Sequence, residues 1–175
     1  MNFQLNEAIE ILERTPKTLD SWLVDLSDGW VTCREGEETW NAYEVIGHLI
    51  EGEKHDWIPR LELILLKGGK ETFPPFDVFA HMKEEKKQTI KDKLAEFTQL
   101  RSTNITRLKE LVDANSDFQL TGQHPVLGTV TAHQLLSTWV VHDLTHISQI
   151  VRVMAERYRD DVGPWKAFLG ILKNN

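Results

Sequence analysis

Three features that commonly point to a function are missing from this chain of 175 residues. Cys33 is the only cysteine, so an intrachain disulfide cannot form and a cysteine-based zinc site is excluded. Acidic residues outnumber basic ones by 27 to 20, whereas binding to a phosphate backbone needs positive charge. No stretch approaches the roughly 18 consecutive apolar residues that indicate a membrane span. We therefore expect neither nucleic acid nor a membrane among the partners.

The N-terminus also lacks the basic and apolar regions of a secretory signal peptide, because MNFQLNEAIEILERTP is acidic and amphipathic. Together with the single cysteine, this indicates a reducing compartment, and we expect a cytoplasmic protein. The apolar fraction of 41% and the charged fraction of 27% are typical of a globular chain. A chain of this length can bury a sizeable core, so residues 1–175 are expected to form a single domain.

Most of the chain has the apolar spacing of α-helices. Four long helical segments are predicted, over residues 3–29, 41–68, 90–111 and 131–159, followed by a short C-terminal helix over 163–172. Thr15-Pro16 interrupts the first segment and can begin a new helical stretch. Pro59 predicts a kink in the second. The sequence therefore predicts an all-α fold, a four-helix bundle with a broken first helix and a short C-terminal helix.

The connecting segments are long enough to cross the bundle. Residues 28–39 have the mixed composition of a loop. KETFPPFDVFAHM, after the second helical segment, is expected to form a packed loop whose aromatic side chains cover an end of the core. Residues 112–130, which include GQHPVLG, are rich in turn signals.

Arg101 occupies a position in the third helical segment where the spacing calls for an apolar residue. A buried guanidinium must meet a carboxylate or backbone carbonyls. We expect an ion pair inside the bundle with Glu53, Asp56 or Asp77. A clamp for an anionic substrate is the alternative, which we rank second.

His142 and His146 are one helical turn apart, so their side chains project from one face of the fourth helix, about 6 Å apart along its axis. That face also carries Leu135 and Trp139, and Trp139 is expected in the core rather than on a substrate. Two buried imidazoles need partners, and one divalent transition metal satisfies both. The spacing also arises by chance, and two ordinary histidines hydrogen-bonded to their surroundings remain the alternative.

A third ligand is expected on the second helix. His48 lies two turns inside that helix among apolar neighbours, and His55 is a rival two turns further along. A lone histidine on a helix is more often a core or rim residue than a ligand. No second metal site is expected, because the remaining histidines lie in or beside loops: His81, His124 and His133.

Two segments, EVIGHLIEGEKHDW and HPVLGTVTAHQLLSTWVVHDLTHISQIVRV, resemble the histidine motifs of the DinB-like superfamily of bacterial four-helix proteins. The His after a small residue, here His48, and the His-x-x-x-His pair followed by Gln, here His142 and His146, match the family's metal ligands. FPPFDVFA and FTQLR also resemble recurring family features, so the likeness spans nearly the whole chain. It implies a bundle with a three-histidine metal site, commonly for Zn or Ni.

Some members of this superfamily are metal-dependent thiol transferases that use a low-molecular-weight thiol such as bacillithiol or mycothiol, and others are described as hydrolases. Since three ligands leave a coordination position open, the resemblance implies a metal-dependent enzyme that acts on a small-molecule substrate by one of these reactions. The competing hypothesis is a non-catalytic metal-binding or stress-response protein. Apolar residues on the outer helix faces are compatible with a homodimer.

Three further residues have candidate roles in such a site. Glu51, one turn from His48, is a candidate general base, and Gln149, one turn from His146, can orient a bound ligand. For both, we rank a supporting or solvent-facing role higher. His124 either lines the mouth of the site or stabilises its turn, and the sequence favours neither.

Overall fold

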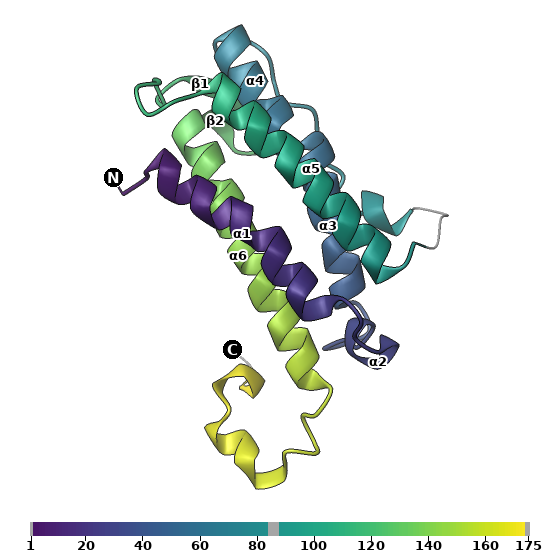
Figure 1. Ribbon diagram of the computed structural model, residues 1–175. Helices are drawn as coiled ribbons and strands as arrows, with labels where there is room; N and C mark the ends of the chain where they lie inside the picture. The colour runs from purple at the N-terminus through teal and green to yellow at the C-terminus, as the bar shows by residue number, and fades with distance from the viewer. Residues whose placement is uncertain (1, 84–87, 174–175) are drawn as a thin grey trace.

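The computed structural model describes residues 2–83 and 88–173. Its elements in chain order are α1 (Leu5–Leu23), α2 (Asp28–Val31), α3 (Ala42–His55), α4 (Trp57–Lys67), the 3-10 helix η1 (Ala80–Met82), α5 (Ile90–Leu111), β1 (Thr121–His124), β2 (Gly128–Thr131), α6 (Ala132–Glu156), η2 (Gly163–Phe168) and η3 (Gly170–Leu172). The long helices α1, α5 and α6 lie side by side with a rod that α3 and α4 form together (Figure 1). The predicted four-helix bundle is confirmed.

The rod of α3 and α4 runs parallel to α5. Lys93 lies over the ring of Tyr43 near the start of both rods, and Arg107 pairs with Glu62 further along both. The connection therefore has to return along the bundle between them. It starts beside the β1–β2 hairpin, where the Phe73 N–H donates to the Gln123 carbonyl at 2.7 Å. The predicted crossover thus connects two neighbouring rods that run parallel to each other (Figure 1).

The helix starts follow local capping chemistry. Asn41 and Thr131 each accept a hydrogen bond from the backbone N–H three residues on, and the side chains of Glu44 and Gln134 accept bonds in return. Both helices therefore begin with a complete capping box. The rod of α3 and α4 breaks at Asp56, three residues before Pro59. This agrees with the predicted kink, because Pro59 has no backbone N–H to donate within the helix.

The predicted break in the first helix is wrong. α1 continues from Leu5 to Leu23 with Pro16 inside it. Because Pro16 has no N–H, the Leu12 carbonyl four residues earlier loses its partner within the helix. The Arg101 Nη1 group donates to that carbonyl at 2.8 Å. A side chain of α5 thus supplies the hydrogen bond that α1 lacks.

Three connecting or terminal segments also differ from expectation. Residues 28–39 contain the short helix α2, and the turn-rich segment forms the antiparallel hairpin of β1 and β2, paired from Thr121↔Thr131 to His124↔Gly128. These elements have four residues each, too few for a periodic signal. The C-terminal helix consists of the 3-10 helices η2 and η3, and α6 ends at Glu156 rather than near residue 159.

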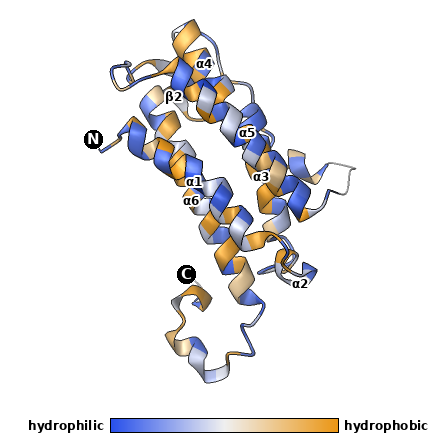
Figure 2. Cartoon of the chain, viewed as in Figure 1, coloured by the Kyte–Doolittle hydropathy of each residue, from blue (hydrophilic) through white to orange (hydrophobic). Residues whose placement is uncertain are grey.

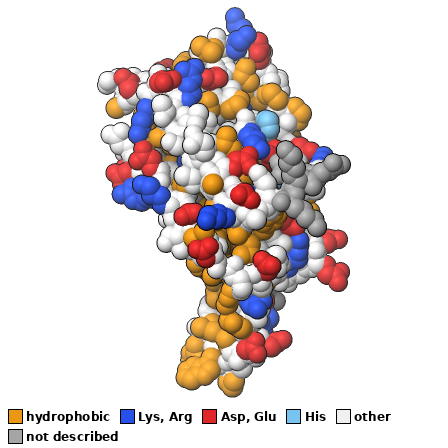
Figure 3. All heavy atoms as spheres, turned by 45° about the vertical axis from the view of Figure 1, so that its right-hand side comes forward, with side chains coloured by type: hydrophobic (Ala, Val, Ile, Leu, Met, Phe, Trp, Pro, Cys, Tyr) orange, Lys and Arg blue, Asp and Glu red, His pale blue; other side chains and the backbone are white. Residues whose placement is uncertain are grey.

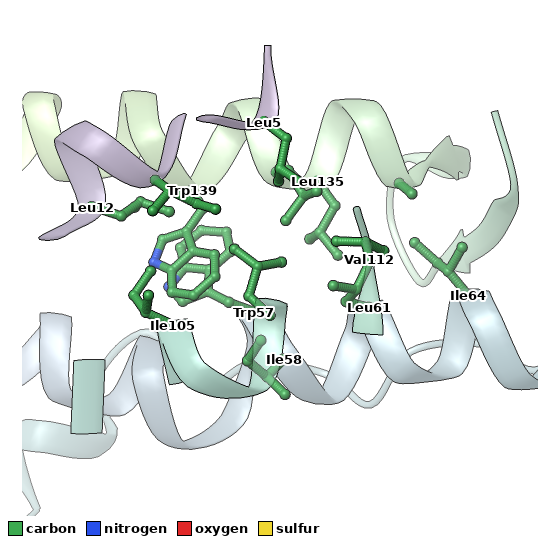
Figure 4. Packing of buried hydrophobic residues seen from close by; sticks show 14 of the residues in the cluster. Leu5, Leu12, Trp57, Ile58, Leu61, Ile64, Ile105, Val112, Leu135 and Trp139 are labelled. Carbon is green, nitrogen blue, oxygen red and sulfur yellow. The ribbon is translucent and has the colours of Figure 1, made fainter. Parts of the chain in front are cut away.

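The hydrophobic core has two parts, with polar side chains between them. One part includes Leu12, Trp57 and Trp139 (Figure 4), and the other includes Leu19 and Ile150. On each rod, the buried side chains between the two parts are polar, apart from Pro16 on α1. The central ones, which we call the polar layer, are Glu53, Arg101, Asp143 and the three histidines His48, His142 and His146.

The outer faces of the helices are mixed in polarity, as Figure 2 shows. No helix in the described ranges is long and apolar enough to cross a membrane. The aromatic residues of the crossover cover the core only in part, because Phe73 is buried in it while Phe79 is exposed. Exposed apolar side chains gather on the C-terminal segment (Figure 3), namely Trp165, Phe168, Leu169 and Ile171. The homodimer stays a prediction.

Candidate metal centre

Three histidines from two helices meet in the polar layer. α3 contributes His48, and α6 contributes His142 and His146 from successive turns. The Nε2 atom of His142 lies 3.1 Å from Nε2 of His48 and 3.1 Å from Nε2 of His146. One nitrogen of each ring lies within 4.8 Å of the others. The structure thus brings together the three residues that the sequence singled out.

This arrangement fits a divalent metal. A neutral imidazole nitrogen has one lone pair or one N–H, so three nitrogens that converge on one point cannot satisfy each other. Nitrogens that bind one tetrahedral zinc at about 2.0 Å lie about 3.3 Å apart, close to the spacing of the three rings. His146 donates its Nδ1–H to Gln149 Oε1 at 2.8 Å, which leaves the lone pair of its Nε2 facing the other two.

Burial keeps the three rings neutral at pH 7. Burial, together with the charge of the neighbouring histidines, lowers the pKa of His48 to about 4 and that of His142 to about 3. The pKa of His146 is also lowered by burial, although the bond to Gln149 opposes the shift. Neutral imidazole is the form that binds a metal.

Aromatic rings surround the histidines. The ring of Trp40 lies 4.9 Å from that of His48 and 6.4 Å from that of His146, nearly parallel to the latter. Phe76 contacts His48 edge-on from the crossover segment, and Trp57 contacts His142 edge-on from α4. These rings limit the access of water to the three nitrogens.

His81 is a further histidine beside this centre, and the sequence set it aside as a loop residue. It lies on η1 and is buried, with its ring 5.8 Å from that of His48. Burial and the charge of Lys93 lower its pKa. Gly47 makes room for it, since a Cβ there would lie 3.1 Å from the Cβ of His81. The small residue before His48 was the available signal.

The other candidates do not join the three histidines. The rival ligand His55 is exposed, and it lies 3.6 Å from the Glu51 carboxylate. Glu51 also contacts Lys54 at 3.3 Å. His124 accepts two backbone N–H bonds within its own turn at 3.1 Å each, which supports the turn-stabilising alternative. Gln149 contacts the ring of His146, in agreement with the supporting role ranked higher above.

Arg101 forms the expected buried ion pair, as one member of a larger cluster. Its Nη1 donates to Asp143 Oδ2 at 2.6 Å, and its Nη2 donates to Asp143 Oδ1 and Glu53 Oε1, each at 2.9 Å. Burial by itself would lower the pKa of Arg101, but the two carboxylates together raise it. Glu53 also accepts bonds from Asn104 and Trp139. We call these residues the Arg101 cluster.

Of the three carboxylates expected beside Arg101, only Glu53 is confirmed. Asp56 pairs with Arg60 at 2.6 Å, and Asp77 pairs with Lys83. Each lies close in sequence to a cation that the prediction did not consider.

The sequence missed Asp143, the second partner of Arg101. It is fully buried and lies one turn after Trp139, on the core-facing stripe of α6. A charged residue at that point of the stripe was the signal that could have identified it.

The surface is hollowed beside His142. The hollow has a volume of about 400 Å³ and is lined by Ser137, Thr138, Val141, His142 and Thr145, all from α6. One of the three converging histidines therefore borders the surface of the molecule.

Together these features define a class of protein, a four-helix bundle that holds three histidines from two helices in a buried polar layer. The family model for the DinB superfamily matches residues 11–150, and the chain belongs to that superfamily. The resemblance seen in the sequence is confirmed.

One solved structure similar to this chain is YfiT from Bacillus subtilis, described as a probable metal-dependent hydrolase with an unusual four-helix bundle topology. The two are 22% identical, with a TM-score of 0.75 over 89% of this chain and 88% of that one. At this identity the likeness shows the fold. Among curated proteins, none matches the chain.

Proposed function

We propose that the protein is a metal-dependent hydrolase of small molecules, with His48, His142 and His146 as the ligands of one divalent transition metal, Zn or Ni. The observation that carries the proposal is the convergence of the three rings, in which Nε2 of His142 lies 3.1 Å from Nε2 of His48 and from Nε2 of His146. Within the described residues only these three side chains form such a group, so at least one coordination position is left for water or substrate.

The surrounding residues support a reactive centre. A divalent metal bound there supplies Lewis acidity, which makes a water or thiol in the open position nucleophilic near pH 7. Gln149 fixes the tautomer of His146, and Trp40 limits competing water. We assign Glu51 no role as a general base, because its carboxylate contacts Lys54 and His55. The description of YfiT as a probable hydrolase favours hydrolysis.

Metal analysis tests the ligand assignment. We expect close to one metal per chain in the wild type loaded with Zn or Ni, and loss of that metal in His48→Ala and His142→Ala. His55→Ala is the matched control, since it removes an exposed histidine from α3, and it should keep its metal. A metal-free wild type, or variants that still bind one equivalent, would refute the assignment.

Turnover separates hydrolysis from the competing hypotheses. The loaded protein is incubated with small ester and amide substrates, and separately with bacillithiol and an electrophile. Hydrolysis above the level of His142→Ala supports the proposal. Thiol consumption without hydrolysis would replace it with a transferase. A fully loaded protein that turns over neither set would favour the non-catalytic metal-binding role.

A further inference from the structure

His81 is a buried polar side chain that forms no well-aligned hydrogen bond with the described residues. Its exposed fraction is 7%, and neither ring nitrogen hydrogen-bonds to any described residue. Val78 lies close to the ring but outside hydrogen-bonding geometry. Folded proteins rarely leave both nitrogens of a buried imidazole unsatisfied, because each such group loses its bonds to water. Such a side chain suggests a partner that binds after folding.

The position of His81 points to the metal centre. Its ring is 5.8 Å from that of His48 and packs edge-on against Trp40 at 4.7 Å. Trp40 in turn contacts His48 and His146. His81 does not belong to the group of nitrogens within 4.8 Å, so it lies beside the three histidines without joining them.

We propose that His81 is a substrate-binding residue that hydrogen-bonds the molecule in the open coordination position. The inference rests on the proposed function. A neutral imidazole offers one donor and one acceptor. The ligand class that fits has two heteroatoms on one carbon, one for the metal and one for His81, as in a carboxylate, amide or ester. Trp40 provides an apolar wall for the rest of such a ligand.

The alternative is that His81 serves only as an aromatic filler against Trp40. His81→Phe distinguishes the two roles, because it keeps a ring of similar shape and removes both nitrogens. Since it replaces an unsatisfied buried polar group by an apolar one, we expect thermal stability equal to or above that of the wild type. His81→Gln keeps a hydrogen-bonding group and should restore part of the lost binding.

The experiment uses protein loaded with Co²⁺, whose visible spectrum reports ligand binding without turnover. Acetate is the probe with a second oxygen for His81, and chloride is the control probe without one. We expect His81→Phe to keep one cobalt per chain and its chloride affinity, while its Kd for acetate rises about tenfold or more. His81→Gln should fall between His81→Phe and the wild type.

Two results would overturn the inference. One is an equal acetate Kd in the wild type and in His81→Phe. The other is loss of cobalt in His81→Phe with an unchanged helical circular dichroism spectrum, since His81 would then serve the metal itself. A wild type that binds no cobalt would instead remove the proposed function together with this inference. If His81→Phe does not fold, the comparison of His81→Gln with the wild type decides.

Discussion

The polar layer contains two buried clusters, and they differ in how completely their polar atoms are satisfied. In the Arg101 cluster, the two terminal guanidinium nitrogens make four hydrogen bonds of 2.6–2.9 Å, and only the Arg101 Nε lacks a partner among the described residues. In the histidine cluster, the Nε2 atom of His142 lies 3.1 Å from those of His48 and His146, and the Nδ1 atoms of His48 and His142 lack partners among the described residues.

The two clusters are direct neighbours, because Asp143 lies between His142 and His146 on α6. Although His142 borders the surface while Arg101 and Asp143 are fully buried, the main difference between the clusters lies in their chemistry. In the Arg101 cluster, charges of opposite sign neutralise and hydrogen-bond each other. The histidine cluster consists of neutral rings, whose converging nitrogen lone pairs require a cation. A buried cluster whose polar atoms are satisfied thus organises the bundle, while the neighbouring cluster with unsatisfied nitrogens is suited to a ligand.

We expect the largest change in the free energy of unfolding when the Arg101 cluster is disrupted. Arg101→Met leaves the carboxylates of Glu53 and Asp143 buried without a cation, and it also removes the donor to the Leu12 carbonyl. We expect a loss of about 3–5 kcal/mol in the free energy of unfolding, measured by urea denaturation. Arg107→Met is the matched control on the same helix. Its ion pairs are solvent-exposed, so we expect a much smaller loss than for Arg101→Met.

If the two arginine variants lost similar amounts of stability, the Arg101 cluster would not be the organising feature described above. A double variant, Arg101→Met with Asp143→Leu, sharpens the test. It removes one of the stranded carboxylates and should recover part of the loss.

A smaller effect is expected when the histidine cluster is protonated. In metal-free protein the unfolded chain takes up protons near pH 6.5, whereas folded His48 and His142 do so only near pH 4 and pH 3. The unfolded state thus binds more protons as the pH falls below 6.5, so stability decreases. Each of these two histidines contributes about 1.4 kcal/mol per pH unit, which gives about 3 kcal/mol by pH 5.5.

Urea denaturation with a chelator present, at pH 7.5 and pH 5.5, measures this loss. The variant with both His48→Asn and His142→Asn should show a clearly shallower dependence on pH. The Arg101 cluster does not contribute through its guanidinium, because its two carboxylates raise the pKa of Arg101 and keep it charged throughout. An equally steep dependence in the variant would place the titrating groups elsewhere.

The same comparison explains what the sequence could predict. Helical periodicity, the capping boxes at Asn41 and Thr131, and the His142–His146 spacing are local patterns, and the structure agrees with each. Pro16 was misread because its compensation comes from Arg101, 89 positions away from the carbonyl concerned.

The parts of the site that the sequence missed depend on how separate segments pack. His81 sits in a loop segment that only the crossover brings against α3, through the gap left by Gly47. Asp143 was overlooked because its partner Arg101 lies on another helix. Local spacing therefore identified His142 and His146, and the family resemblance selected His48, whereas the groups that surround them required the assembled bundle.

We expect the smallest effect at Gln149, which contacts His146 on the side of the ring that faces away from the proposed metal. Its amide oxygen accepts the Nδ1–H of His146 at 2.8 Å, and so it holds the ring in the tautomer that presents a lone pair to the centre. Gln149→Ala should weaken metal affinity about 10–100-fold, with little change in the stability of the metal-free protein. Competition with a chromophoric chelator measures the affinity. The exposed Gln99 on α5 offers the control Gln99→Ala, and equal affinities in the two variants would leave His146 oriented by helix packing alone.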